Sequence, residues 1–111
     1  MNASMNNIRD GVEAELTAAN EKHELFHSFH EAYGVILEEF SEATEEIKNC
    51  KDSLIEFFDD IRSNDDASAL DDLNNIKAFA QHAAAEACQV AAMAEKAIQS
   101  YAEYKRKKSD G

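Results

Sequence analysis

Four glutamates have the residue type and the spacing to hold a hydrated metal ion. Glu38, Glu39 and Glu42 form the pattern E-E-x-x-E, and Glu86 stands downstream in a second run of helix-forming residues. Carboxylate oxygens are the ligands that hard cations such as Mg²⁺ prefer, and Mg²⁺ often bridges to substrate phosphates. Glutamate pairs are also common on solvated helix faces, so the direction of each side chain decides between these interpretations.

A helical wheel places Glu39 on the apolar side of its helix. At 100° per residue it lies about 20° from the centre of the apolar stripe, Glu46 lies about 40° away, and Glu42 lies at the border, about 80° away. Glu38 and Glu45 point elsewhere, as on a solvated face. The stripe consists of Ala32, Ile36, Ala43, Cys50, Leu54, Phe57 and Ile61. A carboxylate in such a stripe must be paired, hydrogen-bonded, protonated or metal-bound, because an unpaired buried charge is costly.

Glu86 lies at the edge of the packing face of the downstream helix, with His82 one turn before it and Gln89 one turn after it. We therefore expect carboxylates from two helices beside a shared core. Lys48 and Lys51 could meet phosphate oxygens of a ligand, or could instead pair with Glu86 across the interface.

Three histidines offer a rival site. His23, His27 and His30 follow one another at spacings of four and three, which can suit zinc on a continuous helix. Ser28 and Glu31, however, form the S-x-x-E pattern of a capping box, which would start a new helix between His27 and His30. A polar hinge between helices is the preferred interpretation.

The elements that position these residues are predicted to be three helices. The first covers about 7–24, the second runs from the capping box to near Arg62, and the third starts near Ser68, after the polar turn cluster 63–66. The chain has no proline and three glycines, which disfavours strand-and-turn architectures. The expected fold is all-α: two long antiparallel helices and a short N-terminal helix, a bundle completed by a homodimer or higher homo-oligomer.

The length and the net charge of the chain limit the number of domains and the kinds of partner that we expect. We expect one domain over residues 1–111, with 1–6 and 106–111 frayed. The net charge of -12 disfavours direct binding to nucleic acid or anionic membranes. No apolar run could span a bilayer, no signal peptide is evident, and Cys50 and Cys88 suggest free thiols. These features predict a soluble cytoplasmic protein.

Two segments resemble the small MazG-like proteins of bacteriophages and Gram-positive bacteria. They are residues 30–42, HEAYGVILEEFSE, and residues 85–94, AEACQVAAMA. MazG-like proteins are all-α nucleoside triphosphate pyrophosphohydrolases, which cleave between the α and β phosphates. Their signature is E-E-x-x-E on one helix and E-x-x-D on the next, which together hold Mg²⁺.

The resemblance implies roles for individual residues. Glu39, Glu42 and Glu86 would bind Mg²⁺, and Glu38 or Glu39 would activate the attacking water. Apart from the resemblance, we expect Lys48, Lys51 and His82 as further contacts of the nucleotide, together with Gln89. Gln89 stands where the family has aspartate, so one charged metal ligand is missing.

Two other functions remain open. The same scaffold could sequester a nucleotide or a nucleotide-derived signal without hydrolysis, which in a phage protein would counter defence in the host cytoplasm. Alternatively, the acidic surface could bind a basic host protein.

Overall fold

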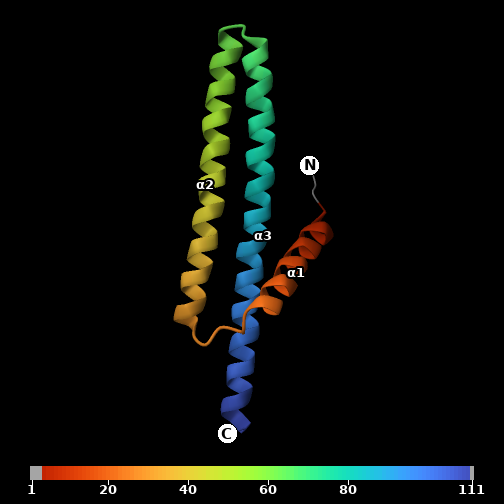
Figure 1. The fold of residues 1–111 in the computed structure, drawn as a ribbon, viewed down its shortest axis with the longest axis vertical. Coiled ribbons are helices and arrows are strands. Elements are labelled where there is room, and N and C mark those ends of the chain that lie inside the picture. The colour runs from red at the N-terminus through yellow and green to blue at the C-terminus, as the bar shows by residue number, and fades with distance from the viewer. Residues whose placement is uncertain (1–3, 111) are drawn as a thin grey trace. The chain divides into compact units, whose positions relative to one another are not determined.

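The computed structural model describes residues 4–110 as three helices (Figure 1): α1 (Met5–Lys22), α2 (Phe29–Arg62) and α3 (Asp66–Asp110). The described residues contain no strand, which confirms the all-α prediction. None of these helices is long and apolar enough to cross a membrane. The predicted fraying of 1–6 and 106–111 falls partly on 1–3 and 111, which lie outside the described residues.

The chain divides into two compact units. Met1–Phe40 and Ala87–Gly111 form the first, here called the three-helix unit, because it contains α1 and parts of α2 and α3. Ser41–Glu86 form the second, here called the hairpin unit, which contains the rest of α2 and α3 and the turn that joins them.

Small side chains and close approaches build the three-helix unit. Ser4 caps α1 by accepting a hydrogen bond from the Asn6 N–H, at 3.2 Å. Among the described residues of this unit, Leu16 on α1, Ala32 on α2 and Ala92 on α3 are the buried apolar ones. Gly11 also allows α1 to approach α3, because a Cβ at this position would lie 3.4 Å from the sulfur of Cys88.

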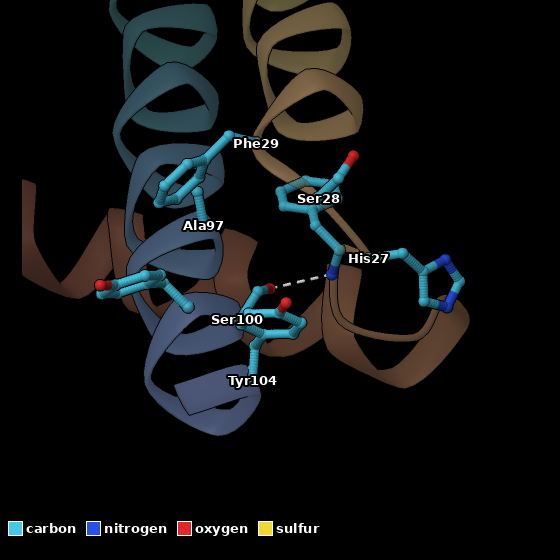
Figure 2. Close-up of a pocket in the computed structure, with 8 residues that line it drawn as sticks. His27, Ser28, Phe29, Ala97, Ser100 and Tyr104 are labelled. Carbon is cyan, nitrogen blue, oxygen red and sulfur yellow. Dashed lines mark hydrogen bonds between the residues drawn. The ribbon is translucent and has the colours of Figure 1, made fainter. Parts of the chain in front are cut away.

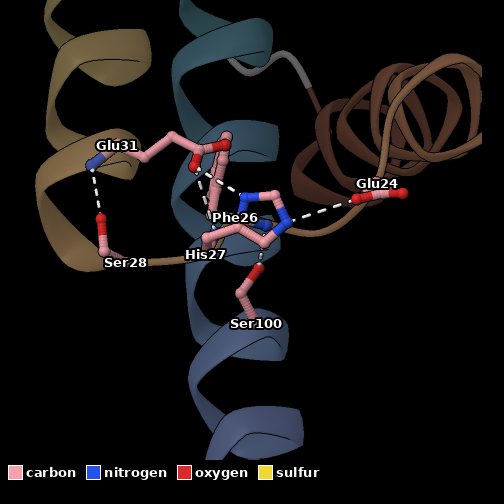
Figure 3. Close-up of polar contacts among 6 residues, drawn as sticks. All are labelled: Glu24, Phe26, His27, Ser28, Glu31 and Ser100. Carbon is pink, nitrogen blue, oxygen red and sulfur yellow. Dashed lines mark hydrogen bonds and ion pairs between the residues drawn. The ribbon is translucent and has the colours of Figure 1, made fainter.

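The predicted capping box at the start of α2 is present in a modified form (Figure 3). Ser28 Oγ accepts a hydrogen bond from the Glu31 N–H at 3.1 Å, as the pattern requires. The Glu31 carboxylate accepts in return from the N–H of His27, at 3.3 Å, rather than from that of Ser28. The His27 ring lies 3.3 Å from both Glu24 and Glu31. This segment is therefore the predicted polar connection between helices, and the carboxylates of Glu24 and Glu31 hold it in place through their contacts with His27.

The turn between α2 and α3 ends the second helix where the sequence predicts it, after Arg62. Asn64 takes the left-handed conformation, with φ 55°, which asparagine tolerates better than most residues. The third helix begins at Asp66, two residues before the predicted start near Ser68, because Asp65 is its N-cap. Asp65 accepts hydrogen bonds from the Ser68 N–H and hydroxyl, and these bonds lower the pKa of its carboxyl.

The hairpin unit pairs its two helices in antiparallel register. Cys50 Sγ on α2 lies 3.7 Å from the carbonyl oxygen of Ile76 on α3, and Glu46, four residues earlier, lies 3.7 Å from His82, six residues later. The buried residues along this contact seam are small or polar: Ser53, Asp72 and Ala83.

The predicted packing face of α2 is only partly correct in the hairpin unit. Leu54 and Ile61, placed in the core by the wheel, are 56% and 51% exposed. Ser53 and Asp60, one position earlier in each case, face the seam instead and are buried and half-buried. The apolar stripe is therefore rotated away from the seam by about one residue, or roughly 100°.

Replacement of Ser28 by alanine tests the cap of α2. The Ser28→Ala variant should lose about 1 kcal/mol of unfolding free energy, because the Glu31 N–H loses its acceptor. Urea denaturation followed by circular dichroism measures this. The same exchange at Ser41, an exposed serine inside α2, is the control and should not destabilise the protein, since alanine favours helix. Equal stabilities of the two variants would contradict the capping role.

The pair Asp60–Asp72 makes stability depend on pH. A hydrogen bond with Asp60, burial and the charges of Asp60, Glu56 and Asp71 raise the pKa of Asp72 from 3.8 to about 6. A raised carboxyl pKa means that the folded state binds this proton more tightly than the unfolded state. The resulting stabilisation should be full below pH 3.8 and should disappear as the pH rises towards about 6.

The Asp72→Asn variant should remove this component. Its unfolding free energy should vary less with pH between 4 and 6 than that of the parent, because the neutral amide no longer titrates. Denaturant titrations at a series of pH values provide the measurement. An unchanged pH profile in the variant would show that Asp72 does not carry the effect.

Candidate functional site

Two of the predicted metal ligands meet across the helices of the hairpin unit. Glu42 on α2 and Glu86 on α3 each offer a carboxylate oxygen, and these atoms lie within 4.8 Å of each other. Glu42 is exposed, whereas Glu86 is half-buried. Two carboxylates at this separation repel each other unless a proton, a hydrogen-bond donor or a cation compensates them.

Glu39 is the third predicted metal ligand. It stands three residues before Glu42 in the continuous helix α2, so one helical turn separates the two residues, and its side chain is half-buried. Helical periodicity therefore places Glu39 beside Glu42 on α2. Among the described residues, no metal-binding group includes His23, His27 or His30.

Glu39 also lines a pocket of about 550 Å³ within the three-helix unit. The predicted nucleotide contact Gln89 lines it as well. The other lining residues are Glu15, Ala18, Ala19, Lys22, His23, Glu24, Phe26, Glu31, Val35, Met93 and Lys96. A volume of this size lies within the usual range for small-molecule sites, which is roughly 300–1,000 Å³.

Lys96 is one of the pocket residues that sequence reasoning missed. It is only 3% exposed, and its ammonium group lies 4.9 Å from the centre of the Phe26 ring. A buried lysine is rare unless a partner compensates its charge, and the aromatic face does so in part. The local pattern gave no signal for it: Ala92, Lys96 and Ser100 are spaced by four and form a single buried stripe of α3, but a lysine and a serine do not mark a stripe as buried.

The remaining predicted site residues lie elsewhere in their units. Glu38 is exposed on α2 and does not line the pocket. In the hairpin unit, Lys48 pairs with Asp52 at 3.2 Å, Lys51 is exposed, and His82 lies 3.7 Å from Glu46. Lys22 and Lys96 are the lysines that line the pocket.

A second pocket, of about 250 Å³, is largely aromatic (Figure 2). It is lined by Phe26, His27, Ser28, Phe29, Ala97, Ser100, Tyr101 and Tyr104. Ser100 links two of its walls through hydrogen bonds. The Ser100 hydroxyl accepts a hydrogen bond from the Phe26 N–H at 2.9 Å and donates one to the carbonyl oxygen of Lys96 at 2.7 Å. Phe29 stacks on Tyr101 with ring centres 5.2 Å apart.

Comparison with known proteins adds no identification: no protein-family model, curated protein or solved structure matches this chain. The functional assignment therefore depends on the carboxylate group and on the pocket that Glu39 lines.

Proposed function

We propose that this chain is a MazG-like nucleotide-binding protein in which Glu39, Glu42 and Glu86 hold Mg²⁺. The proposal depends mainly on the position of Glu39, which relates both to the metal ligands and to the pocket. Its carboxylate stands one helical turn before Glu42, the hairpin-unit carboxylate that lies within 4.8 Å of Glu86, and it also lines a pocket large enough for a nucleotide. The resemblance to MazG-like proteins assigns these same three glutamates to Mg²⁺.

We expect an anionic ligand with an apolar part to bind at the two lysines of the pocket, with a bound cation compensating its four glutamates, Glu15, Glu24, Glu31 and Glu39. Lys22 and Lys96 supply positive charge for phosphate oxygens, and Lys96 is already held in place against Phe26. Val35 and Met93 supply apolar wall against which a base or sugar can pack. In this proposal Lys96 takes the role that the sequence assigned to Lys48 and Lys51.

Hydrolysis would require one further step. Bound Mg²⁺ would neutralise the phosphates and orient the α phosphorus. A glutamate, Glu38 or Glu39, would accept a proton from water as its oxygen attacks the α phosphorus. The bond from that phosphorus to the bridging oxygen would break, releasing pyrophosphate and leaving a nucleoside monophosphate.

Gln89 favours a second candidate function, which is nucleotide binding without turnover. It lines the pocket at the position where MazG-like proteins carry aspartate, and an amide is a weaker and uncharged metal ligand. The protein would then sequester a nucleotide or a nucleotide-derived signal rather than cleave it.

Nucleotide binding and hydrolysis can be tested together. Calorimetry with nucleoside triphosphates and Mg²⁺ should detect binding, and a pyrophosphate assay should show whether cleavage follows. Binding should be lost in the Glu39→Gln and Glu86→Gln variants, because each removes a charged metal ligand, but kept in Glu45→Gln, an exposed glutamate of the same acidic run.

The outcomes separate the candidates. Pyrophosphate release identifies an enzyme, whereas binding without release identifies a sequestering protein. If no nucleotide binds, or if the Glu45 and Glu86 variants behave alike, the nucleotide proposal fails and an acidic protein-binding scaffold is left.

We also propose that a second copy of the chain covers the apolar face of the hairpin unit. Ile47, Leu54 and Ile61 on α2 recur every seven residues, as in a helix-packing stripe. Phe58 joins this stripe, and Leu70 and Leu73 continue it on α3; all six side chains are exposed.

Both stripes lie on the same side of the hairpin. On each helix the exposed stripe follows the seam residues by one position towards the C-terminus, which is a rotation of about 100° around the helix axis. Because the two helices are antiparallel, these rotations bring both stripes to the same face of the hairpin. The six side chains expose on the order of 600 Å², against about 800 Å² per partner in a stable interface. Two such faces would complete a four-helix bundle.

A single charge in the stripe should prevent this association. The Leu54→Glu variant should be monomeric in analytical ultracentrifugation at concentrations where the parent is dimeric, because the carboxylate would be buried in the interface. Ile55→Glu, an equivalent change about 100° around the helix, is the control and should remain dimeric. A parent that sediments as a monomer would refute the dimer.

A further inference from the structure

The hairpin unit buries a carboxylate that has no cation beside it. Asp72 on α3 is 5% exposed, and its Oδ2 atom is buried without a hydrogen-bond partner. Its carboxyl group is within hydrogen-bond reach of Asp60 on α2, a contact that requires a shared proton, and Glu56 and Asp71 add negative charge nearby. A buried carboxylate in such surroundings is costly when ionised.

The chain itself offers little compensation at this point. Residues 52–72 contain eight acidic side chains and a single basic one, Arg62. The guanidinium of Arg62 lies over the Phe58 ring, 5.6 Å from its centre. None of the ion pairs found among the described residues includes Asp60 or Asp72.

We propose that Asp60 and Asp72 bind a hydrated divalent cation of the Mg²⁺ type. Two carboxylates with the remaining coordination positions taken by water is the arrangement that Mg²⁺ commonly adopts in proteins. The unpartnered Oδ2 of Asp72 supplies a buried oxygen ligand, and Asp60 supplies the second from the opposite helix. Glu56 adds negative charge nearby, which favours a cation at this point.

This site lies at a different position from the carboxylates of Glu42 and Glu86, and a cation bound to it would have a different effect. It lies between the last turns of α2 and the first turns of α3, near the turn that joins them. A cation there would link the two helices and stabilise the folded hairpin by mass action. It would compete with the proton that Asp60 and Asp72 otherwise share, so its effect should be greater at neutral than at acidic pH.

The experiment uses the full chain with Glu42→Gln and Glu86→Gln, which removes two ligands of the other group. Titration with MgCl₂ is followed by ¹H–¹⁵N spectra and by thermal unfolding, at about pH 7.5 and about pH 5. At the higher pH we expect saturable shifts of the amide signals of residues 60 and 72 and a rise in Tm. At the lower pH both effects should weaken.

Two further variants decide the outcome. Asp72→Asn in this background should lose the saturable shifts and the rise in Tm, whereas Asp71→Asn, the same change at the exposed neighbouring position, should keep both. Circular dichroism shows whether each variant is folded. Equal Mg²⁺ responses of the two variants, or no saturable shift at residues 60 and 72 in the parent background, would overturn the proposal.

Discussion

The contact seam of the hairpin unit contains carboxylates and small side chains where most helix pairs place large apolar ones. Ser53 and Asp72 are buried in it, and Glu46 and Glu86 are half-buried. Carboxylates that point inward are costly unless they are compensated, and apolar side chains that point outward gain nothing from burial within the hairpin. The metal binding and self-association that we propose are physical responses to this arrangement.

In the three-helix unit, buried polar groups are compensated in a different way. Its buried polar groups find partners within the chain: Ser100 bonds to Phe26 and to the Lys96 carbonyl, and the Lys96 ammonium lies over the Phe26 ring. These contacts fix the segment between α1 and α2 and form one wall of the larger pocket. Because these polar groups have partners within the chain, contacts that the chain itself supplies hold this wall of the pocket in place.

The helices and their ends were predictable because the signals are local. The S-x-x-E pattern at Ser28 marks the start of α2, and the polar cluster after Arg62 marks its end. The start of α3 was misplaced by two residues, because Asp65 could belong to the turn or cap the helix, and only its bonds to Ser68 distinguish the two roles. Predicting the carboxylate group was also possible, since helical spacing places Glu39 and Glu42 one turn apart.

The amino-acid sequence by itself determined that this chain forms long acidic helices and that glutamates from two of them are placed to meet, because helical periodicity and capping act between residues close in the chain. Tertiary structure decided which side of each helix packs. The seam falls one residue before the apolar stripe, so Ser53 is buried and Leu54 is exposed. It also decided that Lys96 joins the pocket. Both results depend on contacts between distant segments, which no local pattern encodes.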